Sequence, residues 1–439
     1  MPAKDLYRRI RAEIEGILLV DTHEHLISEH VRLGQPVDLF HWFAHYASSD
    51  LIAAGMPAAT LARLRDATLP LDERWAEFAP YWRNVRSTGY GRALLLAAQE
   101  LYEVSDINEA TYRELSEKIQ AANQSGLYHQ VLKERARVQV SILDQLEDFD
   151  LTPRRQLDRR FFAPVFRVDD FVALCNRLDL QTLSTRTDTT IHSLDDLLRA
   201  MDVAFEQAAA DQVVAVKVAV AYERPLAFEK VTKADAERVF NQLCRYPFIA
   251  WDVAEYEQLP PVAWHEAQPL QDYMMHQVIR RAIEYGLPLQ IHTGFQEGNG
   301  NFLANAHPLQ LVNLFIEYPE ARFDLFHAGY PFQRIMATLG KNFPNVYLDL
   351  CWVYVISPWV ARQTLHEWIE TVPANKIFGF GGDYIFVEGS YAHSRMARSS
   401  VAEVLTEKIE SGYLNETEAV NLAHLLLRDN ALHFFRLPA

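Results

Sequence analysis

Short apolar runs alternate with helix-length amphipathic segments along much of the chain. The runs consist mainly of Val, Ile, Leu and Phe, which is typical of strands that are buried on both faces of a parallel sheet. Eight such runs cover residues 17–22, 137–143, 161–167, 213–220, 287–292, 323–327, 345–350 and 377–383. Strands that alternate with helices predict an α/β fold with a parallel sheet.

Helix-periodic segments separate the later runs, and each ends where Gly or Pro stops a helix. These segments cover residues 272–285, 308–318, 332–341 and 357–371. We therefore predict a (β/α)8 TIM barrel, with residues 1–439 as a single domain, because such barrels reach this length when their loops carry insertions.

Two segments are too long to be plain connections between a strand and a helix. Residues 29–130 follow the first strand, are mostly helical in pattern and carry many aromatic side chains, so they predict a large helical insertion. Residues 223–271 follow the fourth strand and predict a smaller insertion, with a bend at Leu259-Pro260-Pro261. Loops after barrel strands lie at the face where barrel active sites are built, so both insertions are expected to cap the site.

Composition excludes several classes of protein. The formal net charge is −16 and no dense Lys/Arg run is present, so we expect no nucleic-acid partner. No uncharged apolar run reaches about 18 residues, and the first 16 residues are charged throughout, so neither a membrane span nor a signal peptide is expected. The three cysteines lie far apart and predict no disulfide framework. These features favour a cytoplasmic protein.

Metal-competent side chains stand at the ends of four predicted strands. They are His23 and His25 after the first strand, His292 after the fifth, His327 after the sixth and Asp383 after the eighth. Residues two apart in an extended chain point to the same side, so His23 and His25 can present both imidazoles to one ion. A His-x-His motif alone fits two hydrogen-bonded surface histidines equally well. The agreement of four strand ends favours a divalent ion such as zinc.

With these motifs the sequence resembles the amidohydrolase superfamily, in its amidohydrolase-related branch. The resembling segments are 21–25, 216–217, 292–294, 327–329, 378–384 and 426–431. The resemblance covers the first strand and roughly residues 210–437, and it supports the barrel fold. It implies four metal ligands, namely His23, His25, His292 and Asp383. It also implies that His327 lies beside the metal as a catalytic residue that contacts the substrate or the water.

Lys217 stands in a predicted strand that is otherwise made of Val and Ala, so its ammonium is expected at the barrel mouth. In some members of the superfamily a lysine here is carbamylated and bridges two metals. We favour one metal, zinc or else manganese, with Lys217 as a catalytic cation that holds a substrate carboxylate or an acid of the site. A lysine that merely extends its ammonium to solvent is the structural alternative.

Several further residues are candidates for substrate contacts. The candidates are Arg83, Arg92 and Arg395 for an anionic group, and Trp42, Trp82 and Trp352 for the pocket wall. Packing within the helical insertion explains each of them as well. The aromatic insertion is also a candidate interface for a homo-oligomer.

Together these residues predict a metal-dependent hydrolase that acts on an amide, lactone or related bond of a small, carboxylate-bearing substrate. Asp383 would take the proton of the attacking water, and His327 would steady the oxyanion. A looser likeness to uronate isomerases, in residues 38–42, 78–83 and 90–102, keeps an aldose–ketose isomerase open, and the same site fits a decarboxylase. A non-catalytic barrel would predict a damaged ligand set, whereas every position here is filled.

Overall fold

The computed structural model describes residues 2–245 and 263–438. Its strands are β1 (Leu19–Glu24), β2 (Val138–Leu143), β3 (Phe162–Pro164), β4 (Phe166–Arg167), β5 (Val216–Val218), β6 (Leu289–Ile291), β7 (Phe323–Leu325), β8 (Val346–Asp349) and β9 (Ile377–Phe378). The strands pair in parallel in two sheets, in the orders β1-β2-β3 and β4-β5-β6-β7-β8-β9. Each of the eight predicted apolar runs overlaps at least one of these strands, so the prediction of a parallel α/β fold is confirmed.

The predicted run at residues 161–167 is divided into β3 and β4 at Val165. The Val165 amide nevertheless donates to the Leu143 carbonyl at the end of β2, at 3.0 Å. The Phe166 amide then donates to the Ala215 carbonyl just before β5, at 2.9 Å. Residues 162–167 therefore pair with β2 on one side and with β5 on the other, so this one extended segment joins the two sheets.

At the other end of the strand order, β1 lies beside the segment that follows β9. The Thr22 amide donates to the Phe380 carbonyl at 3.1 Å, and the Asp383 amide donates to the His23 carbonyl at 2.8 Å. These bonds bring the first and the last strand positions together, as a barrel requires. They also place Asp383 next to the His-x-His motif.

Helices surround the strands. They are α1 (Pro2–Gly16), α2 (Glu29–Leu33), α3 (Ala47–Ala53), α4 (Ala58–Arg65), α5 (Leu71–Val85), α6 (Gly89–Tyr102), α7 (Tyr112–Ala122), α8 (Asp169–Val172), α9 (Arg177–Thr187), α10 (Leu194–Ala210), α11 (Lys233–Arg245), α13 (Trp264–Glu284), α14 (Val312–Glu317), α15 (Gln333–Asn342), α16 (Val353–Ile356), α17 (Pro358–Thr371), α18 (Val387–Glu410), α19 (Glu416–His424) and α20 (Asn430–Phe434). Among the described helices, none has the length and apolar character needed to cross a membrane.

Two of the predicted helices match the structure closely, as α15 and α17, and two differ. The segment 308–318 begins as a 3-10 turn at Pro308–Leu311 before α14. Helix α13 begins at Trp264, inside the segment 223–271 that was predicted to be an insertion. Its buried side continues through Ala267 and Leu270, so helical packing outweighs the one hydrogen bond that Pro269 removes. The predicted bend at Leu259-Pro260-Pro261 lies outside the described residues.

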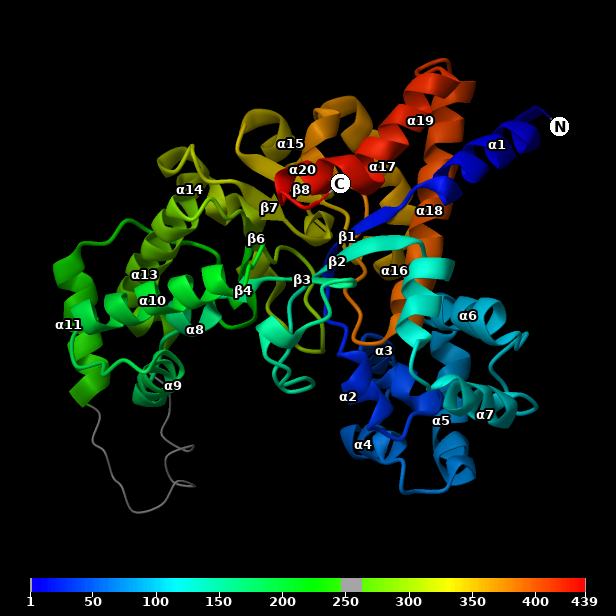
Figure 1. The fold of residues 1–439 in the computed structure, drawn as a ribbon, viewed down its shortest axis with the longest axis horizontal. Helices are drawn as coiled ribbons and strands as arrows, with labels where there is room; N and C mark the ends of the chain where they lie inside the picture. Colours follow the sequence, from blue (N-terminus) through cyan, green and yellow to red (C-terminus); the bar gives the residue numbers. More distant parts are fainter. Residues whose placement is uncertain (1, 246–262, 439) are drawn as a thin grey trace.

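Residues 29–130 form helices α2 to α7, which gather at the lower right of Figure 1, in blue and cyan. Their core is aromatic: Phe43 packs on Phe78 with ring centres 4.6 Å apart. Burial of each large aromatic ring contributes about 2–3 kcal/mol. The cluster reaches the barrel through Tyr46, which stacks on Trp352 at 4.5 Å. Trp352 follows β8, so these helices cover the end of the strands where the chemistry-bearing residues stand.

A buried ion pair joins this helical segment to the long helix α18. Arg32 donates to both carboxylate oxygens of Glu388, at 2.8 and 2.6 Å, and both side chains are fully buried. The Tyr102 hydroxyl donates a third hydrogen bond to Glu388, at 2.8 Å. Burial opposes the charged carboxylate, but Arg32 outweighs it and holds the pKa of Glu388 below its usual value. The pair therefore fixes the position of α2 and α6 relative to the barrel.

Candidate metal centre

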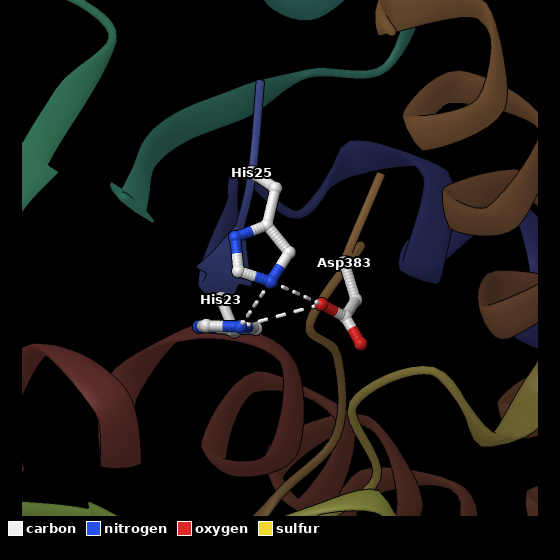
Figure 2. A group of neighbouring side chains, drawn as sticks. All are labelled: His23, His25 and Asp383. Atoms are coloured by element: carbon white, nitrogen blue, oxygen red, sulfur yellow. Dashed lines mark hydrogen bonds and ion pairs between the residues drawn. The ribbon is translucent and has the colours of Figure 1, made fainter. Parts of the chain in front are cut away.

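Three side-chain atoms from two distant segments converge at the ends of β1 and β9. His23 Nε2 and His25 Nε2 lie 3.3 Å apart, and each lies 3.3 Å from Asp383 Oδ1. Figure 2 shows the ring of His23, on β1, the ring of His25, directly after β1, and the carboxylate of Asp383 pointing toward one common point. An equilateral triangle of this size has its centre about 1.9 Å from each corner, which is close to the bond lengths of zinc to nitrogen and oxygen.

The protonation state of His25 is set by the backbone. Its Nδ1 lies 2.6 Å from the carbonyl oxygen of Asp144, at the end of β2. A carbonyl only accepts, so Nδ1 carries the proton and Nε2 directs a lone pair toward His23 and Asp383. Burial, followed by the nearby Lys217 ammonium, lowers the pKa of His23 to about 3, so this ring is neutral too. His25 Nε2 and Asp383 Oδ1 thus present lone pairs to the point that His23 Nε2 also faces, which fits a bound cation.

His292 and His327 form a separate pair beside this triangle. His292 Nε2 lies 2.9 Å from the Phe295 carbonyl oxygen and therefore donates to it. His292 Nδ1 then accepts from His327 Nε2, at 3.0 Å. Burial lowers the pKa of His292 well below its usual value, so the ring is neutral and both nitrogens are occupied. The structure thus brings together three of the four predicted ligands and places His292 next to them, hydrogen-bonded to other groups.

The backbone is left-handed at three of the strand ends that build the site. His327, Trp352 and Asp383 have φ of 63°, 66° and 60°. Such conformations are costly for residues other than glycine, and they persist where the surrounding structure enforces them, often at functional sites. Gly382 precedes Asp383, and a Cβ there would lie 1.8 Å from Glu24 Oε1. The Gly-Gly-Asp sequence after β9 is therefore what allows Asp383 to face the histidines.

Lys217 is buried inside the barrel rather than extended to solvent, which excludes the structural alternative considered for it. Its side chain is 1% exposed, and its Nζ lies 3.5 Å from His23 Nε2 and 3.8 Å from the centre of the Phe326 ring. Burial lowers the pKa of Lys217, with Asp144 and Asp383 opposing that shift. The Lys217 amine thus stands directly beside the converging donor atoms.

A cavity of about 230 Å³ opens above these atoms. It is lined by His23, His25, His45, Tyr46, Leu146, Arg167, Lys217, Ala219, Tyr222, His292, Glu297, Trp352 and Asp383. Sequence reasoning missed Arg167, His45, Tyr46, Tyr222 and Glu297. Arg167 ends the third predicted strand, so the signal that identified the other strand-end residues also applied to it. His45 and Tyr46 come from the helical segment, where no strand periodicity marks a residue that faces the site.

Arg167 is held in place by acidic neighbours. Its Nε donates to Asp144 Oδ1 at 3.2 Å, its Nη2 donates to Asp144 Oδ2, and Asp169 lies 3.6 Å away. Burial would raise the pKa of Asp144, but Arg167 outweighs burial and holds that pKa far below its usual value. The guanidinium is therefore oriented by a charged hydrogen-bonded fork before any ligand is present.

Five predicted substrate contacts do not lie in this cavity. Arg83 and Arg92 are exposed on α5 and α6. Arg395 pairs with Glu15 and Glu100. Trp42 is buried among the aromatic rings of the helical segment, as is Trp82, so these two tryptophans are core residues. Helical periodicity could not show which side of each helix faces the barrel. Trp352 alone of the three tryptophan candidates lines the cavity.

A family model for amidohydrolases matches residues 148–437, which hold His292, His327 and Asp383. The chain belongs to the amidohydrolase family. The resemblance predicted from the strand-end motifs is therefore confirmed. Protein fluG of Emericella nidulans is 26% identical over 231 residues, which is 51% of this chain and 26% of that protein. The chain thus spans about a quarter of the length of this curated relative.

Solved structures confirm the barrel fold of this amidohydrolase. The uronate isomerase of Thermotoga maritima matches with a TM-score of 0.80 at 17% identity, over 98% of this chain and 97% of that one. The glucuronate isomerase of Caulobacter crescentus matches with 0.75 at 15% identity, over 100% and 95%. A candidate metal-dependent hydrolase of Lactobacillus casei matches with 0.67 at 15% identity, over 96% of each chain. At these identities the likeness shows the fold.

Proposed function

We propose that this amidohydrolase uses one catalytic divalent cation, zinc or manganese, to hydrolyse an amide, lactone or related bond in a small, carboxylate-bearing substrate. The observation that carries the proposal is the triangle of donor atoms from His23, His25 and Asp383. These atoms lie in the wall of a cavity that also contains Arg167 and Lys217. A cavity of about 230 Å³ suits a small molecule, and two cations in its wall suit a carboxylate.

A divalent cation held by these atoms lowers the pKa of a bound water and polarises a carbonyl. Asp383 Oδ1 faces His23 Nε2 and His25 Nε2. The other carboxylate oxygen, Oδ2, points toward His327 and lies 3.9 Å from His327 Nδ1. We assign Asp383 the task of accepting the proton of the attacking water and returning it to the leaving group. Arg167, whose guanidinium is already oriented, and Lys217 would hold the substrate carboxylate.

For His327 we propose a positioning role instead of the predicted role of steadying an oxyanion. Its Nε2–H is used on His292, and its Nδ1 lies 3.3 Å from the Cys351 carbonyl oxygen, so neither nitrogen offers a proton to the cavity. Burial lowers the pKa of His327 to about 4, which keeps the ring neutral. The ring would instead stabilise the region between β7 and Asp383.

A second candidate function is the isomerisation of a hexuronate between its aldose and ketose forms. It is supported by the match to uronate isomerases over nearly the whole chain, including the helical segment 29–130, which covers the site. The same divalent-cation site would bind such a substrate, and the basic side chains of Arg167 and Lys217 would hold its carboxylate. The two functions differ in the bond that changes, since only isomerisation exchanges the hydrogen on C2.

The test is a substrate screen followed by NMR in D2O. Metal-loaded protein is incubated with N-acyl amino acids, lactone acids and hexuronates, each beside the Asp383→Asn variant and the Arg83→Ala variant. Hydrolysis should release two products or open a lactone, and Asp383→Asn should lower kcat by about 100-fold or more. Arg83→Ala should match wild type. Deuterium at C2 of a hexuronate would select the isomerase, and wild-type turnover by Asp383→Asn would overturn the role given to Asp383.

A further inference from the structure

Glu297 places a carboxylate in the wall of the cavity, and the proposed function leaves this group unused. Arg167 and Lys217 are partners in the register of β4 and β5, so the two basic side chains enter the cavity from neighbouring strands. Glu297 comes from the loop after β6, which is the next strand of the same sheet. Basic and acidic groups therefore reach one cavity from different segments of the chain.

No basic side chain neutralises this carboxylate. In the described part of the chain, Glu297 forms no ion pair within 4.0 Å with a lysine, arginine or histidine nitrogen. The charge of Arg65 acts on it, but that guanidinium donates to two backbone carbonyls of the helical segment, at 3.3 and 3.0 Å. The hydrogen bonds to the Glu297 carboxylate come from neutral donors, which are the Ser49 hydroxyl at 3.4 Å and the Gly298 amide.

Burial makes this unneutralised charge costly. Glu297 is half-buried, and burial raises the pKa of its carboxyl group, while Ser49, Arg65 and Gly298 oppose that shift. A charged donor stabilises a carboxylate about twice as strongly as a neutral donor does. A cationic group of a ligand would therefore supply the interaction that the protein itself does not give to Glu297.

The loop that carries Glu297 is anchored without its carboxylate. The Glu297 amide donates to the Tyr222 hydroxyl at 3.0 Å, and the Glu297 carbonyl accepts from Asn301 Nδ2 at 2.7 Å. Asn299 Nδ2 donates to the Ser49 carbonyl in α3, at 3.1 Å. Backbone atoms and amide side chains thus hold the loop against the helical segment. The carboxylate is held at the cavity and is available to a ligand.

We propose that Glu297 binds an ammonium group of the substrate, so that the amide or lactone hydrolysed here carries a protonated amine as well as a carboxylate. Arg167 and Lys217 bind the carboxylate, and Glu297 binds the amine. The inference rests on the proposed function, because it adds a cationic group to the carboxylate-bearing substrate. N-acyl amino acids and hexuronates have no ammonium group, so they offer Glu297 neutral donors and bind more weakly than a free amine of similar size.

The experiment measures the Kd of small probes for the zinc-loaded protein by ligand-detected NMR. The probes are β-alanine, γ-aminobutyrate and δ-aminovalerate, each beside the acid of the same chain length without the amine, namely propionate, butyrate and valerate. In wild type, at least one amino acid should bind about tenfold or more tightly than its matched acid, because a charge-assisted hydrogen bond is added. Glu297→Gln keeps the shape without the charge and should remove this difference. Glu320→Gln, which changes an exposed glutamate, should retain it.

The outcomes separate this inference from the proposed function. Equal Kd values within every pair in wild type would overturn the inference, and this comparison requires no variant. A preference for the amino acid that persists in Glu297→Gln would overturn it as well. Arg167→Met should weaken both members of each pair about tenfold or more. Unchanged affinities in Arg167→Met, with the preference intact, would overturn the carboxylate site of the proposed function and leave the role of Glu297. No binding of any probe to wild type would overturn both.

Discussion

His25 is tied to the carbonyl oxygen of Asp144 by a hydrogen bond of 2.6 Å from its Nδ1. The bond crosses from β1 to the end of β2, and the same Asp144 uses its carboxylate to hold Arg167. Asp144 therefore orients both His25, a predicted metal ligand, and Arg167, the residue proposed to bind the substrate carboxylate. These side chains are ordered when the protein folds, so the site is formed before an ion or a substrate arrives.

Metal content should depend on the two histidines of β1. In protein purified without chelators, zinc or manganese should fall by about one equivalent per chain in the His23→Ala, His25→Ala double variant, because two of three ligands are lost. Elemental analysis measures this directly. His129→Ala, which removes an exposed histidine, is the matched control and should leave the content unchanged. An unchanged content in the double variant would contradict the ligand assignment.

Arg167 should determine the affinity for a carboxylate substrate. Arg167→Met removes a charge-assisted hydrogen bond of about 1.5–3 kcal/mol, so KM should rise about tenfold or more once a substrate is known. Arg167→Lys keeps the charge and loses the fork, and it should fall between wild type and Arg167→Met. Arg83→Met and Arg92→Met change exposed arginines and should not alter KM. Equal KM values across the series would show that the carboxylate is bound elsewhere.

Loss of Glu388 should destabilise the whole protein. Glu388→Ala leaves Arg32 buried without its partner, which costs about 3–5 kcal/mol in comparable pairs. Urea unfolding followed by circular dichroism measures the change. Glu77→Ala breaks the exposed pair with Arg63 and should cost about 1 kcal/mol or less. Similar costs for the two variants would mean that the Arg32–Glu388 pair does not secure the helical segment.

His393 should make stability depend on pH. The ring is fully buried, its Nδ1 donates to the Gly382 carbonyl at 2.9 Å, and burial lowers its pKa from 6.5 to about 4. Between pH 6.5 and about pH 4 the unfolded chain binds a proton at His393 that the folded protein excludes. The contribution of the neutral ring to the free energy of unfolding is therefore fully present above pH 6.5, and it is lost as the pH falls toward 4.

The measurement compares wild type with His393→Asn, which keeps a donor for Gly382 but does not titrate. Between pH 7 and pH 5 the free energy of unfolding of wild type should fall by about 2 kcal/mol more than that of the variant. A parallel decline in both proteins would mean that other groups cause the pH dependence.

Much of the site could be read from the sequence because it depends on local rules. An apolar run that ends in His23 and His25, or in Asp383, fixes both a strand and the end at which its polar residues stand. Arg167 also stands at the end of a predicted strand, so the same reasoning could have identified it. His45 and Tyr46 followed no such rule, because a helical residue faces the barrel only through the packing of its helix. For the same reason, five residues that were expected at the site lie elsewhere, namely Arg83, Arg92, Arg395, Trp42 and Trp82.

The sequence by itself determined the order of strands, the family and the identity of the chemistry-bearing residues, since hydrophobic periodicity and strand-end motifs are local properties. Only the tertiary structure decided which nitrogen of His25 and which nitrogen of His292 carries the proton. That depends on the backbone carbonyl oxygen that each ring meets in the folded chain, at the distant Asp144 for His25 and at Phe295, three residues along the chain, for His292. It also decided that Cys351 lies beside Asp383, because closing the parallel strands brings the ends of β8 and β9 together.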